Sequence, residues 1–194
     1  MNRRFNTIAR LLINGAVTSD QIEIGDGLVN IYRHLFFDDE VRCPLLDGLS
    51  FSSIDEANCF VLNRPFSEEE VARVVHGMAG DKTPGPNSFS MAFFQRCWDI
   101  VKNDVMAVLH DFHAHGHFEK SMNATFIALI PKRLGALECK DFRPISLVTG
   151  IYKIIAKVLA NRLRMVLEKV VSTSQNAFIG GHQILDSLLI ANES

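Results

Sequence analysis

The chain has 194 residues, of which 47% are hydrophobic and 22% are charged, and its formal net charge is −2. This composition is typical of a folded chain rather than a disordered one, and the length allows one sizeable core or two small ones. The apolar runs are too short for a membrane span, and no apolar stretch follows the basic residues Arg3 and Arg4. We therefore expect no membrane segment and no secretory signal.

The four cysteines lie far apart in the sequence and form no Cys-x-x-Cys pair. Scattered cysteines are typical of reduced thiols, which act as small buried hydrophobic side chains more often than as zinc ligands. We expect an intracellular protein, and the sequence leaves the compartment open between nucleus and cytoplasm.

Charge is distributed unevenly along the chain. Residues 1–100 contain nine Lys and Arg against 14 Asp and Glu, whereas residues 120–169 contain ten against three. A local basic block is an electrostatic footprint for phosphate backbones, but a solvated helix face has the same composition. Charge alone leaves both interpretations open.

In the first part of the chain, apolar residues at helical spacing predict helices over 2–14 and 22–37, separated by the turn signal Asn14-Gly15. Residues 38–55 read as an irregular linker. A further helix is predicted to begin at Ser67, whose side chain caps the amide of Glu70 while the Glu70 carboxylate returns to the amide of Ser67. We expect this helix to end at Gly80.

The second part begins with a stiff proline-rich loop over 81–87, followed by a predicted helix over 89–112 and its end at Gly116. Residues 124–130 predict a strand, 132–140 a loop, and Arg143-Pro144 a rigid turn. The strongest helical pattern covers 151–171, and 184–192 predicts a further helix. One apolar stripe is expected along the helix 151–171: Ile151, Ile154, Ile155, Val158, Leu159, Leu163, Val166, Leu167 and Val170.

Two cations near the predicted strand are candidates for binding an anion. Lys132 follows the strand directly, and Arg143 comes eleven residues later. An ammonium point charge and a planar guanidinium fork that face one place suit a polyphosphate. The alternative is that both are surface cations that flank a loop, and the spacing alone does not decide between the two.

Four histidines, at 110, 113, 115 and 117, form the other conspicuous cluster. His110 and His113 have a helical spacing that a metal site could use, but we favour a solvated helix end. The aromatic residues Phe89, Phe93, Phe94 and Trp98 are expected in a core rather than in base stacking. Nucleophile-elbow, P-loop and dinucleotide-binding patterns do not occur in the sequence.

Taken together, several segments resemble the reverse transcriptase region of plant LINE-type (non-LTR) retrotransposons, in the order and at the spacing of that family. The resemblance is close over 64–193 and weaker before residue 63. It is carried by residues 64–71, 80–87, 123–132, 141–148 continuing into 152–163, and 174–186.

The resemblance implies an α+β, mainly helical fold: a partial reverse transcriptase with fingers and the start of the palm over 63–194, preceded by a connector over 1–62. It implies an RNA-directed DNA polymerase whose partners are an RNA template, a DNA primer and a deoxynucleoside triphosphate, with Mg²⁺ as cofactor. Lys132 and Arg143 would hold the nucleotide phosphates. The template or primer backbone would be contacted by Lys153, Lys157, Arg162 and Arg164.

The sequence also departs from the family pattern. Asn87-Ser88 replaces Asp-Gly after Pro86, and His182 replaces an arginine. The aspartates that hold the catalytic metals in the family have no counterpart within these residues, so we expect no catalytic and no metal-binding residue here. The expected function is a polymerase fragment that is inactive alone. The alternatives are a non-catalytic module that binds nucleic acid or a partner, and a degenerate relic without function.

Overall fold

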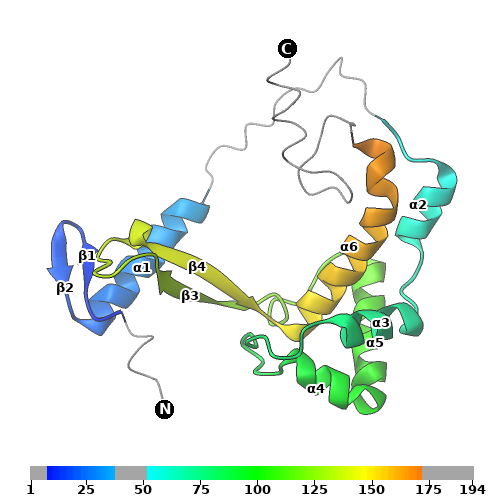
Figure 1. The fold of residues 1–194 in the computed structure, drawn as a ribbon, viewed down its shortest axis with the longest axis horizontal. Coiled ribbons are helices and arrows are strands. Elements are labelled where there is room, and N and C mark those ends of the chain that lie inside the picture. The colour runs from blue at the N-terminus through cyan, green and yellow to red at the C-terminus, as the bar shows by residue number, and fades with distance from the viewer. Residues whose placement is uncertain (1–7, 38–51, 172–194) are drawn as a thin grey trace. The chain divides into compact units, whose positions relative to one another are not determined.

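The computed structural model describes residues 8–37 and 52–171 (Figure 1). The fold is α+β and mainly helical, as expected. It consists of two compact units: residues 1–46 with 126–147, and residues 47–125 with 148–194. These units do not test the predicted boundary at residue 62, which stays a prediction. The helix predicted over 184–192 and the departure at His182 lie outside the described residues.

Unit 1 begins with a β-hairpin where the sequence pattern predicted the end of a helix. Strands β1 (Leu11–Ile13) and β2 (Ala16–Thr18) pair antiparallel. Asn14 and Gly15 both have positive φ, 50° and 83°, which a tight two-residue turn between twisted strands requires. The helix predicted over 2–14 is therefore wrong for its described residues, because the turn formed by Asn14 and Gly15 overrides the helical spacing of Ile8, Leu11 and Leu12.

Helix α1 (Gln21–Phe36) confirms the helix predicted over 22–37. Its start is set by Asp20, whose carboxylate accepts hydrogen bonds from the amides of Ile22 and Glu23 at 2.8 and 3.0 Å. The small core of unit 1 joins this helix to the first hairpin and to the later strands through Leu11, Ile24 and Phe142.

The second hairpin consists of β3 (Thr125–Pro131) and β4 (Phe142–Val148), two neighbouring antiparallel strands (Figure 1). The predicted strand and the loop after it are confirmed, with a short 3₁₀ turn at Cys139–Asp141. The turn predicted at Arg143-Pro144 is wrong, because these residues lie inside β4. Proline is tolerated there since each strand of a two-stranded sheet has a free edge.

Unit 2 contains five helices within the described residues. They are α2 (Glu56–Asn63), α3 (Glu68–Gly77), α4 (Met91–Arg96), α5 (Trp98–His115) and α6 (Gly150–Val170). The helix predicted over 89–112 is interrupted at Cys97, and α3 ends before Gly80. Gly116 ends α5 as predicted, with a φ of 70° that favours glycine.

The core of unit 2 forms where α3, α4, α5 and α6 pack together. Ile151, Ile154, Ile155, Val158 and Val166 of α6 are buried, as the predicted stripe requires. Leu159 and Leu163, which were expected in the same stripe, are 39% and 50% exposed, so the buried face is narrower than predicted. No helix of the described ranges is long and apolar enough to cross a membrane.

Candidate nucleic-acid interface

Lys132 lies at the loop end of the second hairpin, directly after β3. Its amide donates a hydrogen bond to the carbonyl oxygen of Asp141 at 2.8 Å, which joins the end of β3 to the start of β4. Its ammonium group donates to the carbonyl oxygen of Lys140, also at 2.8 Å. The side chain is exposed but oriented by the loop that follows it.

Arg143 is the second residue of β4 and is exposed. The loop beside it is organised by Asp141, whose carboxylate accepts from the amides of Leu137 and Glu138 and forms an ion pair with Arg133 at 2.9 Å. The hydrogen bond from Arg133 is the main reason why the pKa of Asp141 lies below its usual range. A loop held by this carboxylate fixes the start of the strand that carries Arg143.

Helix α6 carries the residues that were predicted to contact a nucleic-acid backbone. Its N-terminus is capped by Thr149, whose hydroxyl accepts from the amide of Tyr152 at 3.3 Å. Lys157 and Arg164 are exposed. Lys153 is half-buried and donates from its ammonium group to the carbonyl oxygen of Thr83, in the proline-rich loop, at 3.2 Å.

Arg162 does not lie on this exposed face. Its side chain is 1% exposed, and its guanidinium forms a bidentate pair with Glu70 of α3, with Nε to Oε1 at 2.9 Å and Nη2 to Oε2 at 2.7 Å. It also lies over the Phe66 ring, 4.6 Å from the ring centroid. The prediction that Arg162 contacts a template or primer is therefore corrected: its hydrogen-bonding groups are engaged inside the protein.

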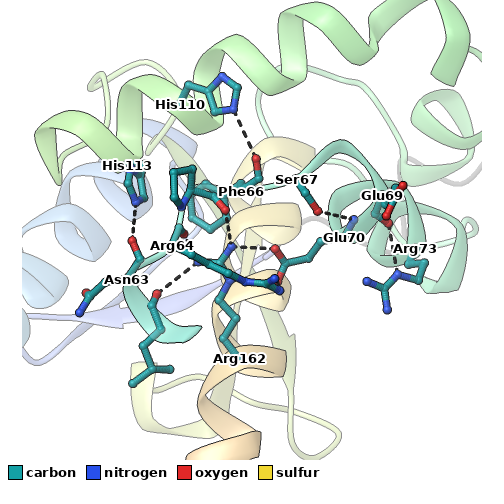
Figure 2. A network of polar contacts seen from close by, with 12 residues as sticks. Asn63, Arg64, Phe66, Ser67, Glu69, Glu70, Arg73, His110, His113 and Arg162 are labelled. Atoms are coloured by element: carbon teal, nitrogen blue, oxygen red, sulfur yellow. Dashed lines mark hydrogen bonds and ion pairs between the residues drawn. The ribbon is translucent and has the colours of Figure 1, made fainter. Parts of the chain in front are cut away.

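The connection between α2 and α3 is held by side chains that bind its backbone (Figure 2). All five carbonyl oxygens of residues 62–66 accept a side-chain hydrogen bond. Arg162 donates to the first, third and fourth of them, His113 to the second at 2.8 Å, and His110 to the fifth at 3.4 Å. Arg162 thus joins three helices of unit 2 through one guanidinium group.

These contacts explain the histidine cluster. Because a carbonyl oxygen only accepts, the Nε2 atoms of His110 and His113 must donate, and both rings are used to hold the connection. Within residues 8–37 and 52–171, no three His, Cys, Asp or Glu side chains come together in a way that could hold a metal ion. His110 and His113 thus have a structural role that the sequence pattern did not predict, and the expectation that the cluster is not a metal site stays a prediction.

Glu70 was predicted as a helix-capping residue, and its larger role was missed. Ser67 does cap the amide of Glu70, at 3.3 Å, so this half of the predicted cap is confirmed. The Glu70 carboxylate is bound mainly by Arg162, and this hydrogen bond is the largest cause that lowers its pKa. A signal was present: Arg162 occupies a position of the apolar stripe, four residues after Val158 and four before Val166. A charge at a core position predicts a buried partner.

The lowered pKa of Glu70 predicts a pH-dependent stability. A carboxyl whose pKa is lower in the folded than in the unfolded chain stabilises above its unfolded pKa, about 4.3, and loses that contribution as pH falls through the folded value. We expect the free energy of unfolding to decline below about pH 4.3, and to decline less steeply in Glu70→Gln. Urea titrations at several pH values measure this. Glu69→Gln, at an exposed neighbour, should keep the wild-type pH dependence; an unchanged slope in Glu70→Gln would contradict the assignment.

The sequence is related at a distance to a protein encoded by a transposon. The relative is the Transposon TX1 uncharacterized 149 kDa protein of Xenopus laevis, with 29% identity over 184 residues. The match covers 93% of this chain and 14% of that protein, so the chain spans a small part of its relative's length. No protein-family model matches the sequence.

Proposed function

We propose that this chain is part of a LINE-type reverse transcriptase, forming the fingers and the entrance to the palm. Two observations on the sequence support the proposal. The segments of residues 64–186 resemble that polymerase region in order and spacing, and the sequence is related to a transposon protein over almost its whole length. In this role the second hairpin binds the phosphates of the incoming nucleotide, and the exposed cations of α6 contact the template or primer.

The observation that carries the nucleotide-binding role is the pairing of β3 with β4. The bond from the Lys132 amide to the Asp141 carbonyl, continued as an antiparallel ladder, sets Arg143 opposite Ile130. Opposite residues share a face, and residues two apart on a strand also share one. From this register we infer that Lys132 and Arg143 belong to the same face of the hairpin, and that Phe142, which is buried in the core of unit 1, belongs to the other.

Magnesium enters this proposal only through the family resemblance. Two-metal phosphoryl transfer requires carboxylates that hold both ions. The described residues offer no group of three candidate ligands, so they do not fit such a centre and we derive no chemical step through a metal. The role proposed for these residues is to bind and orient phosphate groups.

The proposal is tested by measuring the binding of a deoxynucleoside triphosphate to the full chain. We expect Lys132→Gln and Arg143→Gln each to weaken binding about tenfold or more, because each removes a charge-assisted hydrogen bond worth roughly 1.5–3 kcal/mol. Titration with a fluorescent nucleotide gives the dissociation constants.

Lys140→Gln is the matched control, since it removes the same charge from the same loop. The ammonium group of Lys140 pairs with Glu138 at 2.7 Å, and this variant should change binding by less than twofold. If neither Lys132→Gln nor Arg143→Gln weakens binding more than the control does, the hairpin is not a nucleotide site.

A second candidate function is nucleic-acid binding without catalysis, which the exposure of Lys157 and Arg164 favours. Measuring the binding of RNA and of nucleoside triphosphates to the same protein distinguishes the two functions. A chain that binds RNA, loses that binding in Lys157→Gln and Arg164→Gln, and shows no affinity for nucleoside triphosphates would be a binding module rather than a polymerase part.

A further inference from the structure

The groove between α3 and α6 contains a second cluster of cations, in which Arg64 and Arg73 have no role predicted from the sequence. A hollow of about 210 Å³ is lined there by Arg64 at the end of α2, by Glu70 and Arg73 of α3, and by Asn161 and Arg162 of α6. Three helices of unit 2 thus contribute polar side chains to one small volume.

The charges around this hollow do not cancel. Arg162 and Glu70 neutralise each other through their bidentate contact. Arg64 is only loosely attached to the same carboxylate, with Nη2 3.8 Å from Oε1, and its side chain is 41% exposed. Arg73 is exposed and donates from Nε to the carbonyl oxygen of Glu69 at 3.3 Å, which leaves its charge unpaired by that contact.

Arg64 also carries an unmet hydrogen-bond donor. Its Nε atom is buried and has no hydrogen-bond partner within the described part of the chain. A buried donor without an acceptor is unfavourable, and the edge formed by Nε and a terminal nitrogen is one of the two forks by which arginine binds oxyanions. Because Arg64 lines the hollow, an oxyanion bound there is a candidate acceptor for this unmet donor.

We propose that this hollow is a phosphate-binding site formed by Arg64 and Arg73, with the side-chain amide of Asn161 as an additional donor. A carboxylate has two oxygens, and one guanidinium fork satisfies them. A phosphate group presents more oxygens and, as a free ion, carries up to two charges, which suits two guanidinium groups and an amide. The site does not depend on the polymerase assignment, since it uses none of the residues of the hairpin.

The test measures the binding of inorganic phosphate, of pyrophosphate and of a ten-nucleotide RNA to the full chain, by isothermal titration and amide chemical shifts. We expect saturable shifts at residues 64, 73 and 161, and a dissociation constant raised about tenfold or more in Arg64→Gln and in Arg73→Gln. Arg96→Gln, at an exposed arginine of α4 that does not line the hollow, should bind like the wild type. Arg73→Gln decides the matter even if Arg64→Gln fails to fold, because Arg73 is exposed.

The two phosphate sources give different supporting results. If RNA binds the wild type, loses affinity in Arg64→Gln and Arg73→Gln, and inorganic phosphate does not saturate the site, the ligand is a nucleic-acid backbone. If inorganic phosphate or pyrophosphate saturates the site and RNA does not bind, the ligand is a free anion. Unchanged binding in both variants, or an equal loss in Arg96→Gln, overturns the proposal. Displacement of phosphate by an oligoglutamate peptide at equal concentration also overturns it, because the site would then bind carboxylates.

Discussion

Replacing Arg162 with methionine is expected to lower the free energy of unfolding by about 3–5 kcal/mol. The variant leaves the Glu70 carboxylate buried without its partner, and it removes the donors that bind three carbonyl oxygens of the α2–α3 connection. Methionine keeps much of the side-chain volume, so the loss reports the polar contacts. Denaturant unfolding can be followed through Trp98, the single tryptophan, which is buried in the core of the same unit.

Arg164→Met provides the control for this substitution. It makes the same chemical change two residues further along α6, at an exposed position, and should alter the stability by less than about 1 kcal/mol. The double variant Glu70→Gln with Arg162→Met should be less destabilised than the sum of the single variants, since the unpaired charge is gone. Equal stabilities of Arg162→Met and Arg164→Met would show that the buried network is dispensable.

Ile154→Ala is expected to destabilise unit 2 by about 2–5 kcal/mol. The side chain is fully buried where α6 packs on its neighbours, so shortening it removes apolar contacts and leaves a cavity that the surrounding helices fill only in part. The same tryptophan-detected unfolding measures the loss. A shift in the midpoint without a change in the denaturant slope identifies an effect on stability alone.

Leu163→Ala tests whether the buried face of α6 is as narrow as the structure has it. This residue belongs to the predicted stripe but is half exposed, and its truncation should reduce the stability by less than about 1 kcal/mol. A loss of stability as large as that of Ile154→Ala would indicate that Leu163 is buried, as the broader stripe predicted from the sequence requires.

Features controlled by neighbouring residues were predictable. Ser67 accepts the backbone amide three residues ahead, and Gly116 takes the positive φ that ends a helix. Such signals act within one turn of the chain, so the sequence alone contains the interaction. The strand that ends at Pro131 and the helix that starts after Thr149 were predictable for the same reason.

Features controlled by distant residues were not predictable in this way. The strand β4 requires β3 as its partner, and a proline inside it argued for a turn. The break at Cys97 and the exposure of Leu163 depend on how α4, α5 and α6 pack. Periodicity reports which residues can share a face, but the neighbouring element decides how wide the buried face becomes.

The candidate sites also differ in whether they are formed by residues that are near or distant in the sequence. Lys132 and Arg143 could be proposed from the sequence because they lie eleven residues apart, on the two sides of one loop. The hollow between α3 and α6 joins Arg64 and Arg73 to Asn161, nearly a hundred residues later, and only the packing of the helices brings them together. Arg162 was assigned to a template or primer contact through the family resemblance, and its position within the apolar stripe was the sign of a buried role.

Unit 1 is formed by two segments that are far apart in the sequence, so the ribosome synthesises them at different times. Leu11 is buried in one cluster with Phe142, and the amide of Leu12 donates a hydrogen bond to the carbonyl oxygen of Leu137. About 130 residues separate Leu11 from Phe142, which at 5–20 residues per second is roughly 7–26 seconds of synthesis. During that interval the apolar side chains of the first hairpin and α1 lack the residues of the second hairpin that cover them, and we expect this transient exposure to favour chaperone binding.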